Sequence, residues 1–229
     1  MKADLSLIGE AGRVAMALPA ETLDLLVFTT GIMAGPQREV TADGIEQDLA
    51  ISYLSRFVIL KRIASRLGVN RTRSGMKPRV FVMGFPGSNQ TADVGDLNSE
   101  RGYGRIKAHS NTVAGNEVLV LDFARRFPGI DVFGLNPGFV KTNIRANLLG
   151  SKKLLAAIEW FFLFMALEPD IYAKRLTPLL VSPDLTGHSG AMFNNKAEAI
   201  MPSTRSTEPD YAAALMAASE TVVSLVGSK

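Results

Sequence analysis

Residues 79–83 read RVFVM, and residues 131–142 read DVFGLNPGFVKT. Each segment carries an apolar run of strand length, which is typical of a strand buried on both faces of a parallel sheet. A long loop and a helical pattern over Asn111–Arg126 separate the two, and Asn136-Pro137-Gly138 forms a turn after the second. The stretch therefore predicts two parallel strands joined by a helical crossover, with ligands expected at the carboxyl ends of the strands.

The same alternation continues on both sides of this stretch. Upstream, the pattern predicts a helix from Asp4 or Ser6 to about Leu18, a strand over Leu23–Thr29 and a helix from Gly44 to about Leu67. Downstream, it predicts a helix over Ile171–Val181 and a short strand over Ser189–Phe193. We therefore expect one α/β domain over residues 1–229, with helices that flank an open sheet.

Composition narrows the function classes. The chain has 229 residues, of which 47% are hydrophobic, and a net charge of +3 with 25 basic residues spread along the sequence. Because no basic stripe results, we expect no nucleic-acid partner. The sequence has no cysteine and only two histidines, so no metal site is expected. The composition fits a cytoplasmic location, and Asp4, Glu10 and Arg13 interrupt the amino-terminal stretch where a signal peptide is apolar.

Residues 154–167 form a long apolar run, LLAAIEWFFLFMAL. Its length falls short of the roughly twenty residues that a membrane-spanning helix needs. Two interpretations stay open. The segment could pack as a helix over a pocket for a small apolar substrate or ligand, or it could lie on a membrane surface.

Two neighbouring segments carry a family resemblance. Residues 96–103 read DLNSERGY, and the helical stretch that follows contains Ala114-Gly115-Asn116 and, at residues 123–126, FARR. Both segments resemble the short-chain dehydrogenase/reductase family, closest to its retinol-dehydrogenase-like branch. The resemblance implies a Rossmann-like sheet and an NAD(P)-dependent oxidoreductase that acts on an alcohol or carbonyl of a small apolar molecule.

The same register implies a changed active site. It places His109 where the family has its catalytic Tyr, Val113 at the catalytic Lys, Gly84 at the catalytic Ser, and Ser52 at the Asn that helps to relay protons. We therefore expect the family's usual hydride transfer to be impaired. His109 is then a candidate general acid or base, because imidazole exchanges protons near neutral pH, or a hydrogen-bonding group of the pocket wall.

A competing catalytic pair is Tyr103 and Lys107, which form a Tyr-x-x-x-Lys string. Its chemistry needs both side chains on one face of a helix, one turn apart, so that the ammonium group favours the phenolate. Gly102 and Gly104 flank the tyrosine and place it before the expected helix. The alternative interpretation is a loop tyrosine near a solvated lysine.

The resemblance also implies a site for NADP or NAD. The positions that in the family meet the adenine, form the turn after a strand, or hold the nicotinamide and a phosphate oxygen are here Asp4, Gly31, Asn136, Pro137, Gly138, Val140 and Thr142. No Gly-rich phosphate loop of the family's kind precedes Leu23. The expected sheet therefore lacks the family's first two strands and that loop, and with them half of the cofactor cradle.

Without those strands, Leu23–Thr29 lies at an edge of the sheet, where an apolar strand needs a cover. The cover could be the amino-terminal helix, a second copy of the chain or a preceding segment of a longer protein, so a homo-oligomer is one expectation. Three functions stay open: a diverged oxidoreductase, a binding protein or cofactor-independent isomerase or cyclase for a small apolar molecule, and an interaction subunit that completes its sheet with a partner.

Overall fold

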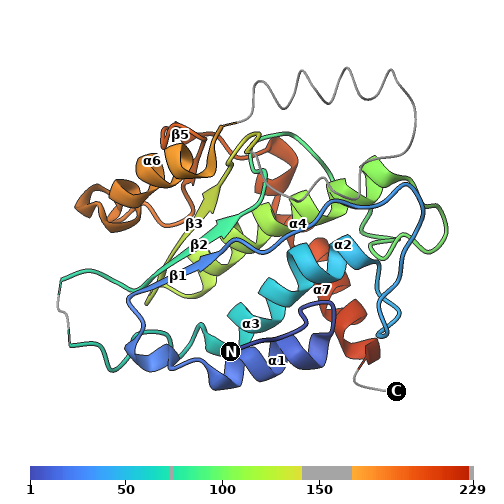
Figure 1. Ribbon diagram of the computed structural model, residues 1–229, viewed down its shortest axis with the longest axis horizontal. Coiled ribbons are helices and arrows are strands. Elements are labelled where there is room, and N and C mark those ends of the chain that lie inside the picture. Colours follow the sequence, from blue (N-terminus) through green and yellow to red (C-terminus); the bar gives the residue numbers. More distant parts are fainter. Residues whose placement is uncertain (73–74, 141–166, 227–229) are drawn as a thin grey trace.

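A five-stranded sheet forms the centre of the molecule (Figure 1). The computed structural model describes residues 1–72, 75–140 and 167–226. The strands lie side by side in the order β1 (Leu25–Phe28), β2 (Arg79–Met83), β3 (Asp131–Leu135), β4 (Met192–Phe193) and β5 (Ala199–Ile200). The first four run parallel, and β5 pairs antiparallel with β4. The predicted α/β fold with a mostly parallel sheet is confirmed.

Alternating side chains of β2 build the two halves of the core. Val80 and Val82 pack into one apolar cluster, whereas Phe81, between them, packs into the other beside Phe133 of β3. This alternation follows from the strand period of two. The rings of Phe81 and Phe133 stack with their centroids 5.0 Å apart. Both faces of the central strands are therefore covered, as an apolar parallel sheet requires.

Helices cover both faces of the sheet (Figure 1). The larger cluster lies between the sheet and α1 (Ile8–Ala17), α3 (Ser55–Ile63), α4 (Arg105–Arg126) and α7 (Pro209–Val226). The smaller cluster lies under α6 (Pro169–Val181). A short α2 (Gln47–Leu49) leads through a π-helical segment, Ala50–Leu54, directly into α3. Short 3₁₀ turns occupy Ala20–Thr22, Pro183–Leu185 and Thr204–Thr207.

Several expected bounds need correction. The helix expected from Asn111 begins at Arg105, because extended Gly104 acts as its N-cap residue. The helix expected over residues 44–67 is divided into α2, the π-helical segment and α3. The last strand is limited to β4, and the sequence patterns did not predict β5 or α7.

The edge position of β1 is confirmed, but its apolar sequence suggests more burial than the structure shows. All four residues of β1 are half-buried, because one side of the strand pairs with β2 and no described residue pairs with the other side. The amino-terminal α1 packs against α3 and does not extend the sheet. Residues 154–166 of the apolar run lie outside the described ranges. Within those ranges, no helix is long and apolar enough to cross a membrane.

Candidate active site

A cavity of about 360 Å³ opens where the carboxyl ends of β1, β2 and β3 meet α3 and the first turns of α4. Its volume lies within the range of roughly 300–1,000 Å³ that is usual for small-molecule sites. Apolar side chains form much of its wall, and three polar or charged ones are central to the argument below. The lining includes Ile32, Met33, Met83, Phe85, Val113 and Phe139 with Ser52, Arg56 and His109.

A histidine and a buried carboxylate form a pair at this cavity. The Nδ1 atom of His109, in α4, lies 2.7 Å from the Oδ2 atom of Asp48, in α2. The Asp48 side chain is fully buried, and that of His109 is 27% exposed. A carboxylate at this distance holds the proton on Nδ1, which leaves Nε2 for exchange with a bound molecule. The pair thus has the arrangement of a base oriented by a third group.

Asp48 depends on few other partners. Its Oδ2 atom also accepts a hydrogen bond from the Ala34 amide at 3.2 Å, and its Oδ1 atom, although buried, has no hydrogen-bond partner among the described residues. A buried carboxylate is costly unless it is paired. His109 is therefore the main side-chain partner of the Asp48 carboxylate, and Asp48 in turn orients the His109 ring.

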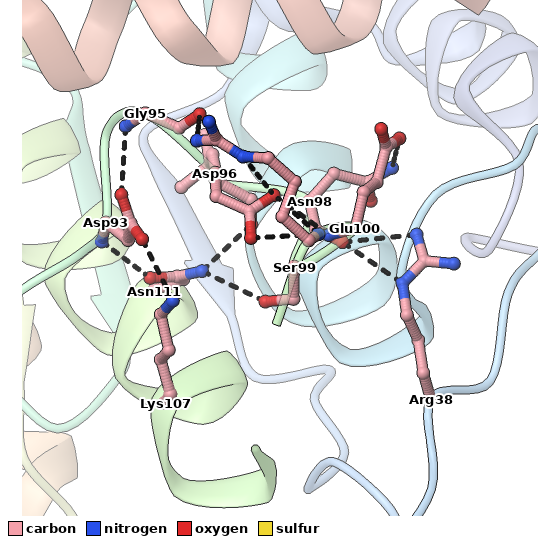
Figure 2. A network of polar contacts seen from close by, with 11 residues as sticks. Arg38, Asp93, Gly95, Asp96, Asn98, Ser99, Glu100, Lys107 and Asn111 are labelled. Atoms are coloured by element: carbon pink, nitrogen blue, oxygen red, sulfur yellow. Dashed lines mark hydrogen bonds and ion pairs between the residues drawn. The ribbon is translucent and has the colours of Figure 1, made fainter. Parts of the chain in front are cut away.

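A polar clamp fixes the first turns of α4, which carry His109 (Figure 2). The Asn111 side chain accepts from the Asp93 amide and donates to the Leu97 carbonyl, both at 2.9 Å. Lys107 Nζ lies 2.9 Å from the Asp93 carboxylate. These contacts join the loop before α4 to the first two turns of that helix, through Lys107 and Asn111.

The same loop also reaches α2, which carries Asp48. Asn98 Oδ1 accepts from the amide of Glu46 at 2.7 Å, and Glu46 is the N-cap residue of α2. The Asn98 carbonyl accepts from the Arg38 guanidinium at 3.1 Å (Figure 2). Because one loop holds both α2 and α4, it sets the separation between Asp48 and His109.

Ser52 shapes another part of the wall. It lies in the π-helical segment, and π-helical turns are frequent at functional sites. Its Oγ atom accepts from the Ile32 amide at 2.8 Å and lies 3.3 Å from the Ile32 carbonyl oxygen. Ser52, which the register places at the Asn of the family, therefore pins the Gly31-Ile32 turn after β1.

The predicted substitutions alter the remaining wall. Val113 and Gly84, which the predicted register places at the family's Lys and Ser, both line the cavity. A Cβ atom at Gly84 would lie 3.1 Å from the Asn116 Cβ atom, so a serine there would crowd α4. Asn116 is itself fixed, since its amide nitrogen donates to the carbonyls of Ser52 and Thr112 at 2.8 and 2.9 Å.

Tyr103 and Lys107 are not brought together at the cavity. Tyr103 precedes α4, and its hydroxyl donates to the Gly35 carbonyl at 2.6 Å. Lys107 pairs with Asp93 and is about half exposed. Neither residue lines the cavity. Their geometry matches the loop tyrosine and solvated lysine of the alternative interpretation.

The predicted cofactor residues divide into three groups. Gly31, Pro137 and Gly138 line the cavity. Asn136 does not line it and braces the turn, since its amide donates to the Pro86 carbonyl at 2.8 Å and its Oδ1 accepts from the Gly138 amide at 3.0 Å.

The other predicted cofactor residues lie apart from the cavity or outside the described ranges. Asp4 lies before α1, accepts from the Ser6 amide and is not part of the cavity lining. Val140 forms an isolated bridge with Leu167. Thr142 lies outside the described residues.

Comparison with known proteins places the chain in a family. No family model matches it. A relative from Saccharomyces cerevisiae, named an uncharacterized oxidoreductase, is 49% identical over 207 residues, which cover 89% of this chain and 67% of the relative. A short-chain dehydrogenase/reductase of Penicillium roqueforti, prx1, is 29% identical over 129 residues, which cover 55% of this chain and 37% of prx1. The chain belongs to the short-chain dehydrogenase/reductase superfamily.

Solved structures agree on the fold of this short-chain dehydrogenase/reductase. The NADPH-bound carbonyl reductase from chicken fatty liver superimposes with a TM-score of 0.57 at 16% identity, over 86% of this chain and 75% of that one. At this identity, the likeness concerns the fold alone. The chain spans about two thirds of the yeast relative and 37% of prx1. Its place in the retinol-dehydrogenase-like branch stays a prediction.

Two residues of the site, Asp48 and Arg56, were missed by the sequence patterns. A signal was available in the sequence, because Asp48, Ser52 and Arg56 recur every four residues along a helical pattern and so share one helix face. In the structure all three side chains are almost fully buried. Buried polar side chains are the informative exception to an apolar interior, so three of them on one helix face mark a candidate site. Apolar residues one position further along the chain repeat with the same spacing, and this apolar pattern was read in place of the polar one.

Proposed function

We propose that the chain is an NAD(P)-linked oxidoreductase that acts on a carbonyl or alcohol of a small, largely apolar molecule, with His109 as the proton-transferring group. One observation carries the proposal: His109, oriented by buried Asp48, lines the cavity at the carboxyl ends of β1, β2 and β3. Ligands of open α/β sheets bind at this end. The family membership supports the oxidoreductase class.

The proton step follows from the chemistry of the pair. In the direction of reduction, Nε2–H of His109 donates a proton to the substrate oxygen, and Nδ1 keeps its hydrogen bond to Asp48. In the direction of oxidation, Nε2 accepts the proton of the alcohol. The Asp48 carboxylate stabilises the imidazolium and holds one ring orientation throughout. General acid–base catalysis of this kind contributes roughly 10²–10⁴ in rate.

The residues of the cavity wall support a place for the nicotinamide end of the cofactor in this proposal. Gly31 and Gly138 present backbone without a side chain, and a Cβ atom at Gly138 would meet the Asn195 side chain at 2.9 Å. Together with Pro137, they would hold the nicotinamide ring, which when bound supplies or accepts the hydride. The phosphates have no Gly-rich turn among the described residues. We expect tight binding to depend on the nicotinamide end.

The family's ordinary route is impaired in this proposal. In the predicted register, Gly84 replaces the serine whose hydroxyl would polarise the substrate carbonyl. Val113 replaces the lysine whose ammonium group would lower the pKa of a phenol. An imidazole is an acid–base group of its own and needs no neighbouring ammonium group to transfer a proton. A different proton donor at the same end of the sheet therefore replaces the usual one.

A second candidate is a cofactor-independent isomerisation of a small carbonyl compound. It is favoured by the presence of both groups that such a reaction needs, namely a base, His109, and a buried cation, Arg56, in one cavity. The base would take a proton next to the carbonyl, and a cation would stabilise the negative charge on oxygen. The same proton then returns to another carbon.

Calorimetric titration of the purified chain with NADPH and NADH tests the first candidate. The variant Gly138→Ala disturbs the backbone of the cavity wall, because φ is +61° and a built Cβ would lie 2.9 Å from the Asn195 side chain. Gly187→Ala is the matched control, because Gly187 also has a positive φ, +83°, but has no atom within 4 Å of a built Cβ. Saturable micromolar binding that only Gly138→Ala weakens supports the proposal. Absence of binding up to millimolar nucleotide removes hydride transfer and leaves the isomerase.

A further inference from the structure

The charge of Arg56 lies inside the protein without a counter-ion. Arg56 is 4% exposed, lies in α3 one turn after Ser52, and lines the cavity. Within the described residues, no carboxylate lies within ion-pair distance of its guanidinium, and the acidic side chain that influences it, Asp48, is already paired with His109. Burial lowers the pKa of Arg56 to about 10, so the group is still a cation at neutral pH.

Its hydrogen bonds all go to neutral oxygens. Nη1 donates to the Met83 carbonyl and, at 2.9 Å, to Asn116 Oδ1, and Nη2 donates to the Thr30 carbonyl. The guanidinium has five N–H groups. Nε–H has no partner among the described residues, and Nη2 carries a second N–H. The group is thus rigidly held while part of its donor capacity stays unused.

A purely structural role accounts for these contacts poorly. Bridging the carbonyls after β1 and β2 needs only neutral donors, and a buried charge without a partner costs several kcal/mol on the order-of-magnitude scale for desolvated ions. The Nη2 atom also lies close to the cavity: a Cβ atom built on Gly31, which lines it, would be 3.5 Å from Nη2. A side chain at position 31 would lie in contact with Nη2, so glycine at this position keeps that side of the guanidinium uncovered.

We propose that Arg56 binds an anionic oxygen of the substrate, and that the substrate is a small apolar molecule with a carboxylate besides its carbonyl or alcohol. Only the carbonyl or alcohol of this substrate rests on the proposed function; the carboxylate does not. Guanidinium donors pair with carboxylate oxygens through charge-assisted hydrogen bonds, which are about twice as strong as neutral ones. A bound carboxylate supplies the charge that Arg56 lacks, and the apolar wall takes the remainder of the molecule.

The experiment uses matched probes on the purified chain without nucleotide. Straight-chain carboxylates from hexanoate to decanoate and the primary amides of equal length are titrated by calorimetry. We expect the carboxylates to bind at least tenfold more tightly than the amides. Equal affinity, or no binding of any member of either series, overturns the proposal. So does tighter binding of inorganic pyrophosphate than of every carboxylate, which would assign Arg56 to a cofactor phosphate.

Two variants locate the preference. Arg56→Gln removes the charge and should abolish the carboxylate preference. Gly31→Ala, which leaves the guanidinium in place but shields Nη2, should reduce it several-fold even if Arg56→Gln fails to fold. Gly9→Ala, in α1 with no atom within 4 Å of a built Cβ, is the control. A preference unchanged in both cavity variants contradicts the assignment.

These probes also separate the two proposals. Carboxylate binding requires neither nucleotide nor proton transfer. If the carboxylate preference is found but NADPH and NADH do not bind, the hydride-transfer proposal is wrong and the Arg56 assignment stands. If the nucleotides bind but amides and carboxylates bind alike, the reverse holds.

Discussion

His109 Nδ1 and Asp48 Oδ2 lie 2.7 Å apart, with the carboxylate fully buried and the imidazole at the wall of the cavity. The two residues come from different helices, α4 and α2, which one polar loop holds in register (Figure 2). The predicted register places His109 at the family's Tyr, whereas Asp48 comes from another helix and has no counterpart among the predicted catalytic positions. The relation between these two side chains is therefore the part of the site most open to experiment.

Asp48→Asn tests the role of the carboxylate as a positioning group. The asparagine amide can donate to Nδ1 and would then move the ring proton to Nε2, which blocks a base at Nε2. We expect a loss of activity on the order of 10²–10⁴, as for other oriented histidines. Nitrogen-15 chemical shifts of the two ring nitrogens report the tautomer directly. An unchanged tautomer with unchanged activity would show that Asp48 only fills space.

Tyr103→Phe distinguishes the two catalytic predictions, His109 and the pair of Tyr103 and Lys107. The hydroxyl of Tyr103 donates to the Gly35 carbonyl, so its removal should cost about 1 kcal/mol of stability in a denaturant titration. Activity should stay within about twofold of the wild-type chain. A severe loss of activity in a folded Tyr103→Phe protein would restore the Tyr103 and Lys107 dyad.

Gly115→Ala tests the close approach of α4 to the π-helical segment Ala50–Leu54. A Cβ atom on Gly115 would lie 2.7 to 2.8 Å from ring carbons of Tyr53, and Tyr53 is anchored because its hydroxyl lies 2.7 Å from the Ser219 hydroxyl. We expect a loss of about 1–3 kcal/mol from overpacking, which outweighs the better helix propensity of alanine. Gly9→Ala, whose site is open, should instead be neutral or stabilising. Similar unfolding midpoints for both variants would contradict the packing.

Tyr172→Phe should stabilise the chain. The hydroxyl of Tyr172, on the buried side of α6, has no hydrogen-bond partner among the described residues, so its removal should gain about 1 kcal/mol. Burial also raises the pKa of Tyr172 to about 12, compared with about 10 in an unfolded chain. The fold favours the protonated form of Tyr172. The part of the free energy of unfolding that depends on this protonation is fully present below about pH 10 and is lost as the pH rises to about 12.

Denaturation measured across the alkaline range checks this sign. Between about pH 10 and 12, the wild-type chain should lose more stability than Tyr172→Phe. Other buried tyrosines titrate in both proteins and cancel in the comparison. Parallel stability curves for the two proteins would contradict the burial of an unpaired hydroxyl.

The central strands were predictable because their sequences are unambiguous. RVFVM and DVFGL are strand-length apolar runs, and β2 and β3 have the predicted bounds. The start of α4 was less predictable, because Arg105–Ser110 is polar and only the backbone of Gly104 marks its N-cap. The half-buried state of β1 depends on its place in the sheet, which its own sequence does not contain.

The site was predictable only where the family register points to a residue. His109 was found from the register, and the cavity lining includes it. Asp48 acquires its meaning from a contact with α4 across 61 positions of sequence, and Arg56 from carbonyls after β1 and β2. Such contacts are set by the packing of distant elements. A helical stripe of polar residues indicates them but does not name their partners.

The proton-transferring role of His109 is tested most directly by a rate comparison between the wild-type chain and His109→Gln. Oxidation of NADPH is followed with a panel of small apolar aldehydes, ketones and keto acids, and circular dichroism confirms that both proteins are folded. Glutamine can retain a hydrogen bond to Asp48 but cannot transfer a proton at neutral pH. We predict turnover by the wild-type chain and a loss of at least about 100-fold in His109→Gln. Turnover that persists unchanged in His109→Gln would contradict the account.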